Sequence, residues 1–454
     1  MHMMWFTERA YHYDPEVEPE KYRLLENQIL KMRSFFGTPN RFFEPEHGSK
    51  LLNQYLDEKV YTDQELLNFD GVMLNEHHGT PFCMGAVMDV EAAALAAKTK
   101  RVKIVLLGNP AATVANQLRL AEELAMIDLI SGGRLVSGWV RGAGSEQFAN
   151  NTNPALNREL FEESVDFIIK AWTTPGPFRY EGKRLHFRHV NPWVLPLQKP
   201  HPPFWIPGLI SPDTAVWCAR RRYPYVALAT KLEPTIELWD YYGLAAAREG
   251  YQAGPENFGY LQPVMIGDNQ ARAEELGKRL LFGGAFAHFA RPEWMFPPGY
   301  NSKSATRRLA QLATGPNVSG KPLFTVEADT DEAIEALKNQ IYGGYPQVLR
   351  DMQMIAGTPD NVIPKLCMIL DVLRPGIFSF WLDGPVSAKE RKRCLELINS
   401  DVIPALREHG KKLGLVSPFE RAPGSRPLPR EASYEPVADP TALQVYASAF
   451  GDPE

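Results

Sequence analysis

Residues 103–140, KIVLLGNPAATVANQLRLAEELAMIDLISGGRLVSGWV, contain two apolar runs separated by a segment with helical periodicity. The apolar stripe of that segment consists of Leu118, Ala121, Ala125 and Leu129. Glutamates lie off the stripe, and two glycines at 132–133 follow as a helix stop signal. The stretch therefore predicts a strand, a helix and a second strand, which is the βαβ unit of a parallel sheet.

Apolar runs of this kind, bounded by turn residues, recur along the chain. They occupy residues 4–8, 71–75, 103–108, 134–140, 203–208, 225–230, 260–267 and 377–384. Such near-continuous runs are typical of parallel strands, because helices bury both faces of a parallel sheet. Eight strands alternating with helices predict a (β/α)8 TIM barrel, and a doubly wound open sheet is the alternative.

Composition restricts the class of partner. The chain has 454 residues, is 44% hydrophobic and carries a net charge of -5 without any block of like charges. It can bury a large core, but its charge gives no support for a nucleic-acid or anionic-membrane partner. The N-terminus has no signal-peptide pattern and no long uncharged apolar run occurs, so we expect a cytoplasmic protein that acts on small molecules.

Several kinds of site find no support in the sequence. The four cysteines are scattered without a CxxC pair, and no set of residues has the spacing of zinc ligands. The glycine motifs of nucleotide triphosphatases and Rossmann domains are absent, as is the GxSxG motif of hydrolases. We therefore expect no metal centre and no disulfide framework.

One long insertion follows the seventh predicted strand, around residues 268–345. It contains the aromatic and apolar residues Trp294, Met295, Phe296 and Tyr300. Because loops after barrel strands shape the substrate end, this insertion is a candidate lid over an apolar substrate. An equally weighted alternative is a surface excursion that packs for stability.

The last part of the chain differs in composition from the rest. From about residue 417 it is dense in proline and poor in periodicity. We expect a barrel domain over residues 1–416 and an extended arm over residues 417–454, either loose or wrapped around a neighbouring subunit.

The motif NEHHG, residues 75–79, directly follows the second predicted strand. In barrel enzymes the active site lies at the carboxyl ends of the strands. Glu76, His77 and His78 are therefore candidates for acid–base catalysis, with a capping or core histidine as the alternative. Adjacent side chains point in different directions, so we expect one of the two imidazoles to face the site.

A second group of strand-end residues suggests an anion site. Its candidates are Asn109, Arg141, Arg158, Gly208, Ser211 and Thr214. Two arginines and a hydroxyl-bearing turn at the start of a helix suit a phosphate monoester. Each residue also has an ordinary alternative: Arg158 as a surface residue, Ser211 as a helix N-cap, and Arg141 as an ion-pair partner.

The chain resembles the bacterial luciferase-like flavin-dependent monooxygenases over about residues 1–410. The resemblance is carried by FDGVMLNEHHG, NQLRLAEELAMIDLISGGRLVSGWVRG, PLQKPHPPFWIPG, GTPDNV and VIPALRE, in that order. It implies a barrel that binds reduced FMN from a separate flavin reductase and uses dioxygen to oxygenate an organic substrate. It also implies a homodimer or homotetramer.

The resemblance assigns roles to particular residues. It implies that His77 is the catalytic histidine, and we expect Glu76 and His78 to support it. It implies that Arg141 and Arg158 bind the flavin phosphate together with Ser211 and Thr214. Two features depart from the family pattern. Val140 stands where luciferases have a reactive cysteine, and the turn GLISP, residues 208–212, is not glycine-rich.

The sequence thus predicts a two-component monooxygenase that uses reduced FMN and acts on a small apolar or carbonyl-bearing molecule. A deazaflavin-dependent oxidoreductase on the same barrel is the nearest alternative. A non-catalytic flavin-binding partner subunit is a third hypothesis, although the retained EHH motif favours an active enzyme.

Overall fold

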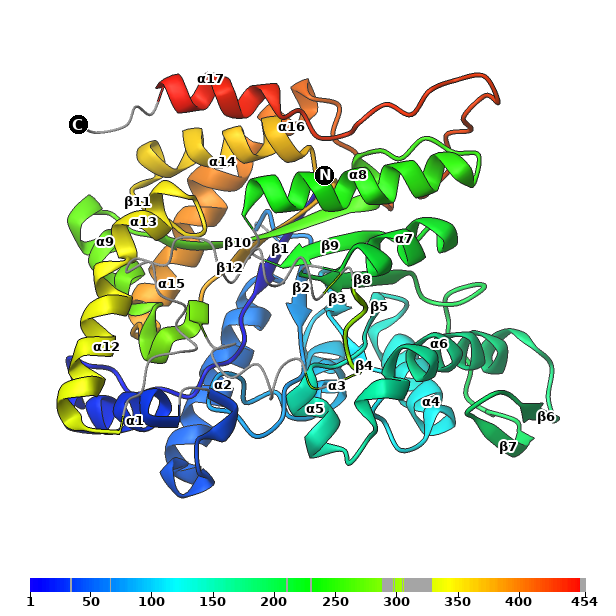
Figure 1. Cartoon of the computed structure of the whole chain (residues 1–454), viewed down its shortest axis with the longest axis horizontal. Helices are drawn as coiled ribbons and strands as arrows, with labels where there is room; N and C mark the ends of the chain where they lie inside the picture. Colours follow the sequence, from blue (N-terminus) through cyan, green and yellow to red (C-terminus); the bar gives the residue numbers. More distant parts are fainter. Residues whose placement is uncertain are drawn as a thin grey trace.

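The computed structural model describes residues 1–32, 35–65, 67–209, 211–228, 231–287, 297, 299–303, 305 and 329–449. Its central feature is a parallel β-sheet that closes on itself (Figure 1). The barrel strands are β1 (His2–Phe6), β2 (Gly71–Leu74), β3 (Lys103–Leu106), β5 (Leu135–Val140), β8 (Phe204–Gly208), β9 (Tyr225–Leu228), β10 (Phe258–Ile266) and β12 (Ile377–Trp381). Each corresponds to one of the eight predicted apolar runs.

Closure of the sheet decides between the two predicted architectures. Strand β1 pairs in parallel with β2 on one side and with β12 on the other, in the register Met4 with Ser379 and Phe6 with Trp381. Strand β10 pairs with β12 and also with β9, so the eight barrel strands form a closed ring in which none has a free edge. A doubly wound open sheet would leave its edge strands unpaired. The predicted (β/α)8 barrel is therefore confirmed, and the open sheet is excluded.

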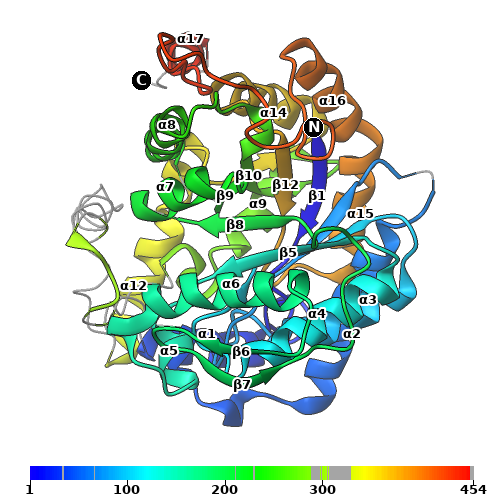
Figure 2. The same cartoon turned by 90° about the vertical axis from the view of Figure 1, so that its right-hand side faces the viewer.

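Helices surround the barrel (Figures 1 and 2). They are α1 (Pro19–Met32), α2 (Pro45–Tyr61), α3 (Met88–Lys98), α4 (Gln117–Ser131), α5 (Gly144–Ala149), α6 (Asn157–Thr173), α7 (Pro212–Arg221), α8 (Leu232–Arg248), α9 (Gln270–Arg279), α12 (Asp331–Gly343), α13 (Tyr345–Arg350), α14 (Pro359–Leu373), α15 (Ala388–Leu397), α16 (Ile403–Lys412) and α17 (Thr441–Ala449). Short strands β4 (Asn109–Pro110) and β11 (Ile355–Gly357) extend the sheet, and β6 (Phe178–Glu181) pairs with β7 (His186–Val190) as a hairpin. Among the described residues, no helix has the length and apolar character needed to cross a membrane.

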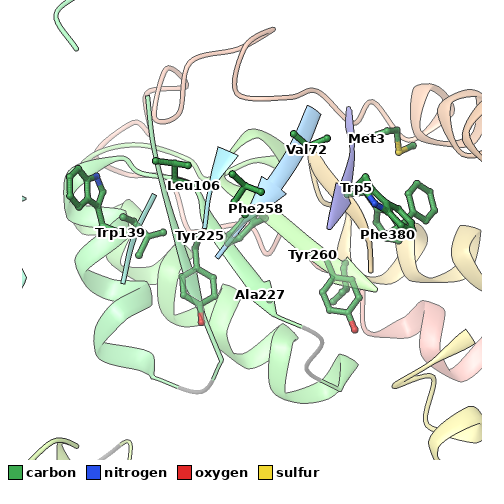
Figure 3. Close-up of a cluster of buried hydrophobic side chains, with 14 of the residues drawn as sticks. Met3, Trp5, Val72, Leu106, Trp139, Tyr225, Ala227, Phe258, Tyr260 and Phe380 are labelled. Carbon is green, nitrogen blue, oxygen red and sulfur yellow. The ribbon is translucent and has the colours of Figure 1, made fainter. Parts of the chain in front are cut away.

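Strand side chains alternate between two separate cores. One set, which includes Met4, Val105 and Trp205, forms a compact cluster that fills the barrel. The other set, which includes Trp5 and Trp139, packs with the surrounding helices (Figure 3). Burial of each such side chain contributes about 1.5–3 kcal/mol. Both faces of the barrel strands are therefore largely apolar, as the sequence pattern predicted.

Helix α4 confirms the predicted βαβ unit but corrects its apolar stripe. The Asn116 side chain caps the first turn by accepting hydrogen bonds from two backbone N–H groups, and Gly132 ends the helix with φ 67°. Leu129 was expected on the buried face, yet it is 44% exposed. Leu124 and Ile127 are buried in its place, because α4 packs against both α3 and α6 and its buried face is wider than one stripe.

The residues after 416 run along the end of the barrel where the strands begin (Figures 1 and 2). Phe419 lies against Trp205, with ring centroids 5.7 Å apart, and covers the inner core of the barrel. Arg426 lies 3.4 Å from the buried Glu256, and Glu420 binds the amino group of Met1 at 3.0 Å. This part of the arm is thus packed on its own barrel, opposite the carboxyl ends of the strands.

The long insertion after β10 is described only in part. Trp294, Met295 and Phe296, the proposed lid residues, lie outside the described residues, whereas Tyr300 lies within them. The following helix α12 is fixed to α1 by a buried carboxylate: Glu26 accepts a hydrogen bond from Tyr342 and lies 3.3 Å from Lys338. The C-terminal part of the insertion, helix α12, is therefore fixed to helix α1.

Close strand packing generates a stability prediction at Gly138. A Cβ atom there would lie 1.7 Å from the Leu106 carbonyl oxygen and 3.0 Å from that of Trp205. Because these are backbone atoms of the flanking strands, Gly138→Ala is expected to destabilise the fold by about 3 kcal/mol. Gly343→Ala is the matched control, since a Cβ there meets nothing within 4 Å and the effect should stay within about 1 kcal/mol. Urea unfolding measures both, and equal stabilities would contradict the prediction.

Candidate active site at the carboxyl rim of the barrel

Closure of the barrel gathers the predicted residues along one arc of its rim. Glu76, His77 and His78 follow β2, and Asn109 follows β3. Arg141 follows β5, and Ser211 follows β8. Because β2, β3, β5 and β8 are consecutive neighbours in the sheet, these residues lie along one side of the barrel mouth. Arg141 and Arg158 both follow the fourth barrel strand, β5, whereas Ser211 and Thr214 follow the fifth, β8.

His77 lies between two carboxyl groups. Its Nδ1 is 2.9 Å from Oε1 of Glu146, and its Nε2 is 3.7 Å from Oε2 of Glu8. Burial disfavours the charged imidazole, but the hydrogen bond to Glu146 and the charges of both carboxyl groups outweigh it and raise the pKa of His77 to about 8. The imidazole therefore holds a proton at neutral pH.

Glu146 is the buried partner that orients His77. It belongs to α5, and its second oxygen accepts hydrogen bonds from the backbone N–H of Ala143 at 2.8 Å and from the Ser145 hydroxyl at 3.0 Å. Although burial would raise the pKa of Glu146, the hydrogen bond and charge of His77 lower it overall. Because the ionised carboxylate only accepts hydrogen bonds, Nδ1 of His77 carries the proton of this contact.

Glu8 is a second carboxyl group at the base of the site. It is buried, and Asn75 donates a hydrogen bond to its Oε2. Burial raises the pKa of Glu8 to about 7, and the charge of Asp383 adds to the rise while His77 opposes it. A carboxyl group and an imidazole that both titrate near neutral pH form a site able to take up and return protons.

The backbone at Glu8 is held by an unusual arginine. Arg9 has φ 62°, in the left-handed region that non-glycine residues rarely adopt. Its buried guanidinium donates to Oδ1 of Asn75 at 3.1 Å and pairs with Glu91 at 3.1 Å, and Glu91 also binds the buried Lys59 at 3.0 Å. This network beneath the rim fixes Asn75 and, through it, the carboxyl group of Glu8.

Glu76 and His78 form a separate pair. His78 Nε2 lies 3.2 Å from Oε1 of Glu76, and the other oxygen of Glu76 accepts a hydrogen bond from the backbone N–H of Met88 at the start of α3. The expectation that they support His77 directly therefore differs from the geometry, in which Glu146 and Glu8 are the neighbours of His77. The adjacent imidazoles point to different partners, as expected.

The other half of the arc is basic. Burial and the nearby charge of Arg141 lower the pKa of Arg158, so the two guanidinium groups lie close enough to repel each other. Arg158 also lies 3.5 Å from Glu162, one helical turn away. The carbonyl oxygen of Arg141 accepts hydrogen bonds from Asn157 at 2.6 Å and Gln147 at 3.1 Å, which fixes its backbone.

Ser211 has the surroundings expected of a ligand-binding hydroxyl. It is the N-cap residue of α7, but its side chain makes no capping hydrogen bond. Its Oγ is buried and has no hydrogen-bond partner among the described residues. A buried hydroxyl without a partner is costly unless a ligand or water satisfies it. The N-terminus of α7 lies beside this hydroxyl, and Asp213 in the same turn acts on the charge of Arg158, so an anion would suit this position.

The remaining predicted residues contribute in other ways. A Cβ at Gly208 would lie 2.4 Å from the Tyr225 hydroxyl, so this glycine permits close packing of the tyrosine. Thr214 lies in the first turn of α7, where its N–H donates to the Ser211 carbonyl at 3.1 Å. Asn109 is buried near Asp89, whose pKa burial raises to about 7.

Sequence reasoning missed Glu8 and Glu146. Glu8 was counted as the last residue of the first predicted strand, although the structure ends β1 at Phe6 and leaves Glu8 at the rim. The strand-end rule could have identified it. Glu146 lies six residues after β5, in RGAGSE, residues 141–146, and no local sequence signal connects it with His77.

Comparisons with known proteins place this geometry in a family. The family model described as luciferase-like monooxygenase matches residues 59–366. The oxygenase component of flavin-dependent trigonelline monooxygenase from Acinetobacter baylyi is 22% identical over 376 residues, covering 80% of this chain and 94% of that protein.

Solved structures agree in fold. The oxygenating constituent of 3,6-diketocamphane monooxygenase from Pseudomonas putida, in complex with FMN, has a TM-score of 0.60 at 17% identity and covers 89% of this chain and 98% of its own. An F420-dependent secondary alcohol dehydrogenase, in complex with an F420-acetone adduct, has a TM-score of 0.55 at 14% identity and covers 89% and 99%. At these identities the likeness concerns the fold.

The family match extends over more than half of the chain and includes β2, β3, β5 and β8, whose ends carry the candidate acid–base and anion-binding residues. The resemblance seen in the sequence is thereby confirmed: the chain belongs to the luciferase-like monooxygenase family and is an oxidoreductase.

Proposed function

We propose that this chain is the oxygenase component of a two-component flavin-dependent monooxygenase. It takes reduced FMN from a separate reductase and uses dioxygen to oxygenate a small apolar or carbonyl-bearing substrate. The observation that carries the proposal is that one rim of the barrel bears two groups of residues. In one group, His77 lies between Glu8 and Glu146. The other group contains Arg141, Arg158 and Ser211. In the same proposal residues 1–416 form the barrel domain, and residues 417–454 form its arm.

The anion site fits the phosphate of FMN. Two guanidinium groups that repel each other gain from a dianion between them, and the Ser211 hydroxyl gains a partner. We assign the phosphate to Arg141, Arg158, Ser211 and Thr214, with Asn109 and Gly208 along the flavin. When bound, reduced FMN supplies the two electrons that dioxygen activation needs.

The residues around His77 handle protons. Nδ1 is held by Glu146, so Nε2, which faces Glu8, is the nitrogen free to exchange its proton. The rings of Phe36 and Phe82 lie about the imidazole, with centroids 5.9 Å and 6.0 Å from it, and both are buried. Their apolar surface limits the access of water to the imidazole, which must deliver one proton at the right moment.

Two alternatives have different support. A deazaflavin-dependent oxidoreductase is favoured by the structural likeness to the F420-dependent alcohol dehydrogenase. A non-catalytic partner subunit would have no use for a proton-holding histidine between two buried carboxyl groups, so the geometry at His77 favours an active enzyme.

Cofactor choice is tested by anaerobic titration with reduced FMN and, separately, with reduced F420. We expect stoichiometric binding of reduced FMN with spectral changes that saturate. On rapid mixing with dioxygen, reoxidation of the bound flavin should be slower than that of free reduced FMN and should show more than one kinetic phase. Tight uptake of reduced F420 without uptake of reduced FMN would replace the proposal by the deazaflavin alternative.

The assignment of the phosphate site predicts a selective loss of affinity. Arg158→Ala should weaken binding of FMN by about 10- to 100-fold, because a hydrogen bond to a charged group contributes about 1.5–3 kcal/mol. Binding of riboflavin, which has no phosphate, should change little. Arg119→Ala is the control, since Arg119 is an exposed residue that pairs with Glu123 on α4. An equal loss for both flavins would show that Arg158 does not contact the phosphate.

The pH dependence of turnover tests the His77–Glu146 contact. Because the pKa of His77 is raised to about 8, a rate that needs the protonated imidazole should fall as pH rises through 8. Glu146→Gln removes the charge that raises this pKa, so the fall should begin roughly one pH unit lower. Glu76→Gln changes the partner of His78 instead and should leave this limb of the profile in place. If the rate of Glu146→Gln falls at the same pH as that of the wild type, Glu146 does not influence the protonation of His77 in turnover.

A further inference from the structure

We infer that Tyr300, from the insertion between β10 and α12, is a positioning residue for the cofactor phosphate and acts through Arg141. The inference rests on the proposed function. The Arg141 guanidinium lies over the Tyr300 ring, 4.4 Å from its centroid, and Nη1 donates to the Tyr300 carbonyl oxygen at 3.1 Å. The Tyr300 hydroxyl donates to the carbonyl oxygen of Gly142 at 2.7 Å. Three contacts thus join one tyrosine to residues 141–142.

The stacked arrangement leaves Arg141 able to bind an anion. A guanidinium group presents five N–H donors in its plane, and stacking uses its face. One donor is taken by the Tyr300 carbonyl, so donors remain along the edges. Arg158 repels Arg141, and without the ring the long side chain would be free to turn away from it. Tyr300 therefore keeps the positively charged guanidinium of Arg141 near Arg158, although the two like charges repel each other.

Residues near Tyr300 contact the other walls of the anion site. The Ser302 hydroxyl donates a hydrogen bond to Asp213, which lies in the first turn of α7 two residues after Ser211. Gly299, with φ 85°, passes so close to the turn before α6 that a Cβ would lie 2.9 Å from Ala155 Cβ. Residues 299–302 therefore contact the turn after β5, the turn just before α6 and the first turn of α7, next to the residues of the candidate anion site. A ligand that binds at this site would therefore contact elements that also hold residues 299–302 in position.

The test compares two flavins that differ only in the phosphate. The dissociation constants of reduced FMN and reduced riboflavin are measured anaerobically for the wild type, Tyr300→Ala and Tyr300→Phe. Loss of a cation–π contact should weaken FMN binding by roughly 2- to 30-fold in Tyr300→Ala, with riboflavin binding unchanged. Tyr300→Phe keeps the ring and the carbonyl oxygen, so it should retain most of the FMN affinity. Tyr241→Ala, which removes an exposed tyrosine on α8, is the matched control.

The possible results separate the inference from the proposed function. If Tyr300→Ala weakens both flavins equally, or weakens neither, while Arg158→Ala selectively weakens FMN, the phosphate site stands and the role of Tyr300 is wrong. If Arg158→Ala is not selective either, the phosphate assignment fails, and the inference fails with it. A loss in Tyr300→Ala that is confined to FMN and restored in Tyr300→Phe supports the inference, because a general folding defect would affect both flavins.

Discussion

The parallel pairing of β1 with β12 is the contact on which the remaining arrangement depends. It closes the sheet, and it places the first and last barrel strands side by side although they are separated by almost the whole chain. Glu8, directly after β1, thereby comes between His77 at the end of β2 and Asp383 after β12. A buried carboxyl group flanked by an imidazole and another carboxyl group is kept near its titration point. An open sheet with the same strands would have left Glu8 at an edge, in contact with water.

The rim separates charge into an acid–base pole and a basic pole. At one pole, carboxyl groups surround His77 and stabilise its proton; at the other, burial and the charge of Arg141 lower the pKa of Arg158. The chain as a whole has a net charge of only -5, so composition conceals this division. Because both poles are partly buried, their fields are screened less than those of surface charges. A ligand that has an anionic end and a proton-accepting end would satisfy both poles at once.

The sequence predicted the barrel strands well because each strand is buried on both faces and therefore appears as a continuous apolar run. It predicted Leu129 on the buried face of its helix wrongly, because a helix between two neighbours buries more than one stripe. It pointed to His77, shortly after β2, and to Arg141, directly after β5, because both lie at strand ends. It could not supply Glu146, whose contact with His77 spans 69 residues and depends on how β2 and the loop after β5 are placed in the closed barrel.

Under the proposed function the flavin arrives from another protein, so this chain would bind and release it in every cycle. The composition of the candidate anion site suits that requirement. Glu162 lies 3.5 Å from Arg158, and Asp213 also acts on its charge, so the charge of Arg158 is partly neutralised before any ligand arrives. Each anion that enters must compete with these carboxylates, which limits affinity. The repulsion between Arg141 and Arg158 acts in the opposite direction, since an anion relieves it. With Tyr300 holding Arg141 close to Arg158, the insertion would set how much of that repulsion is available to favour phosphate binding.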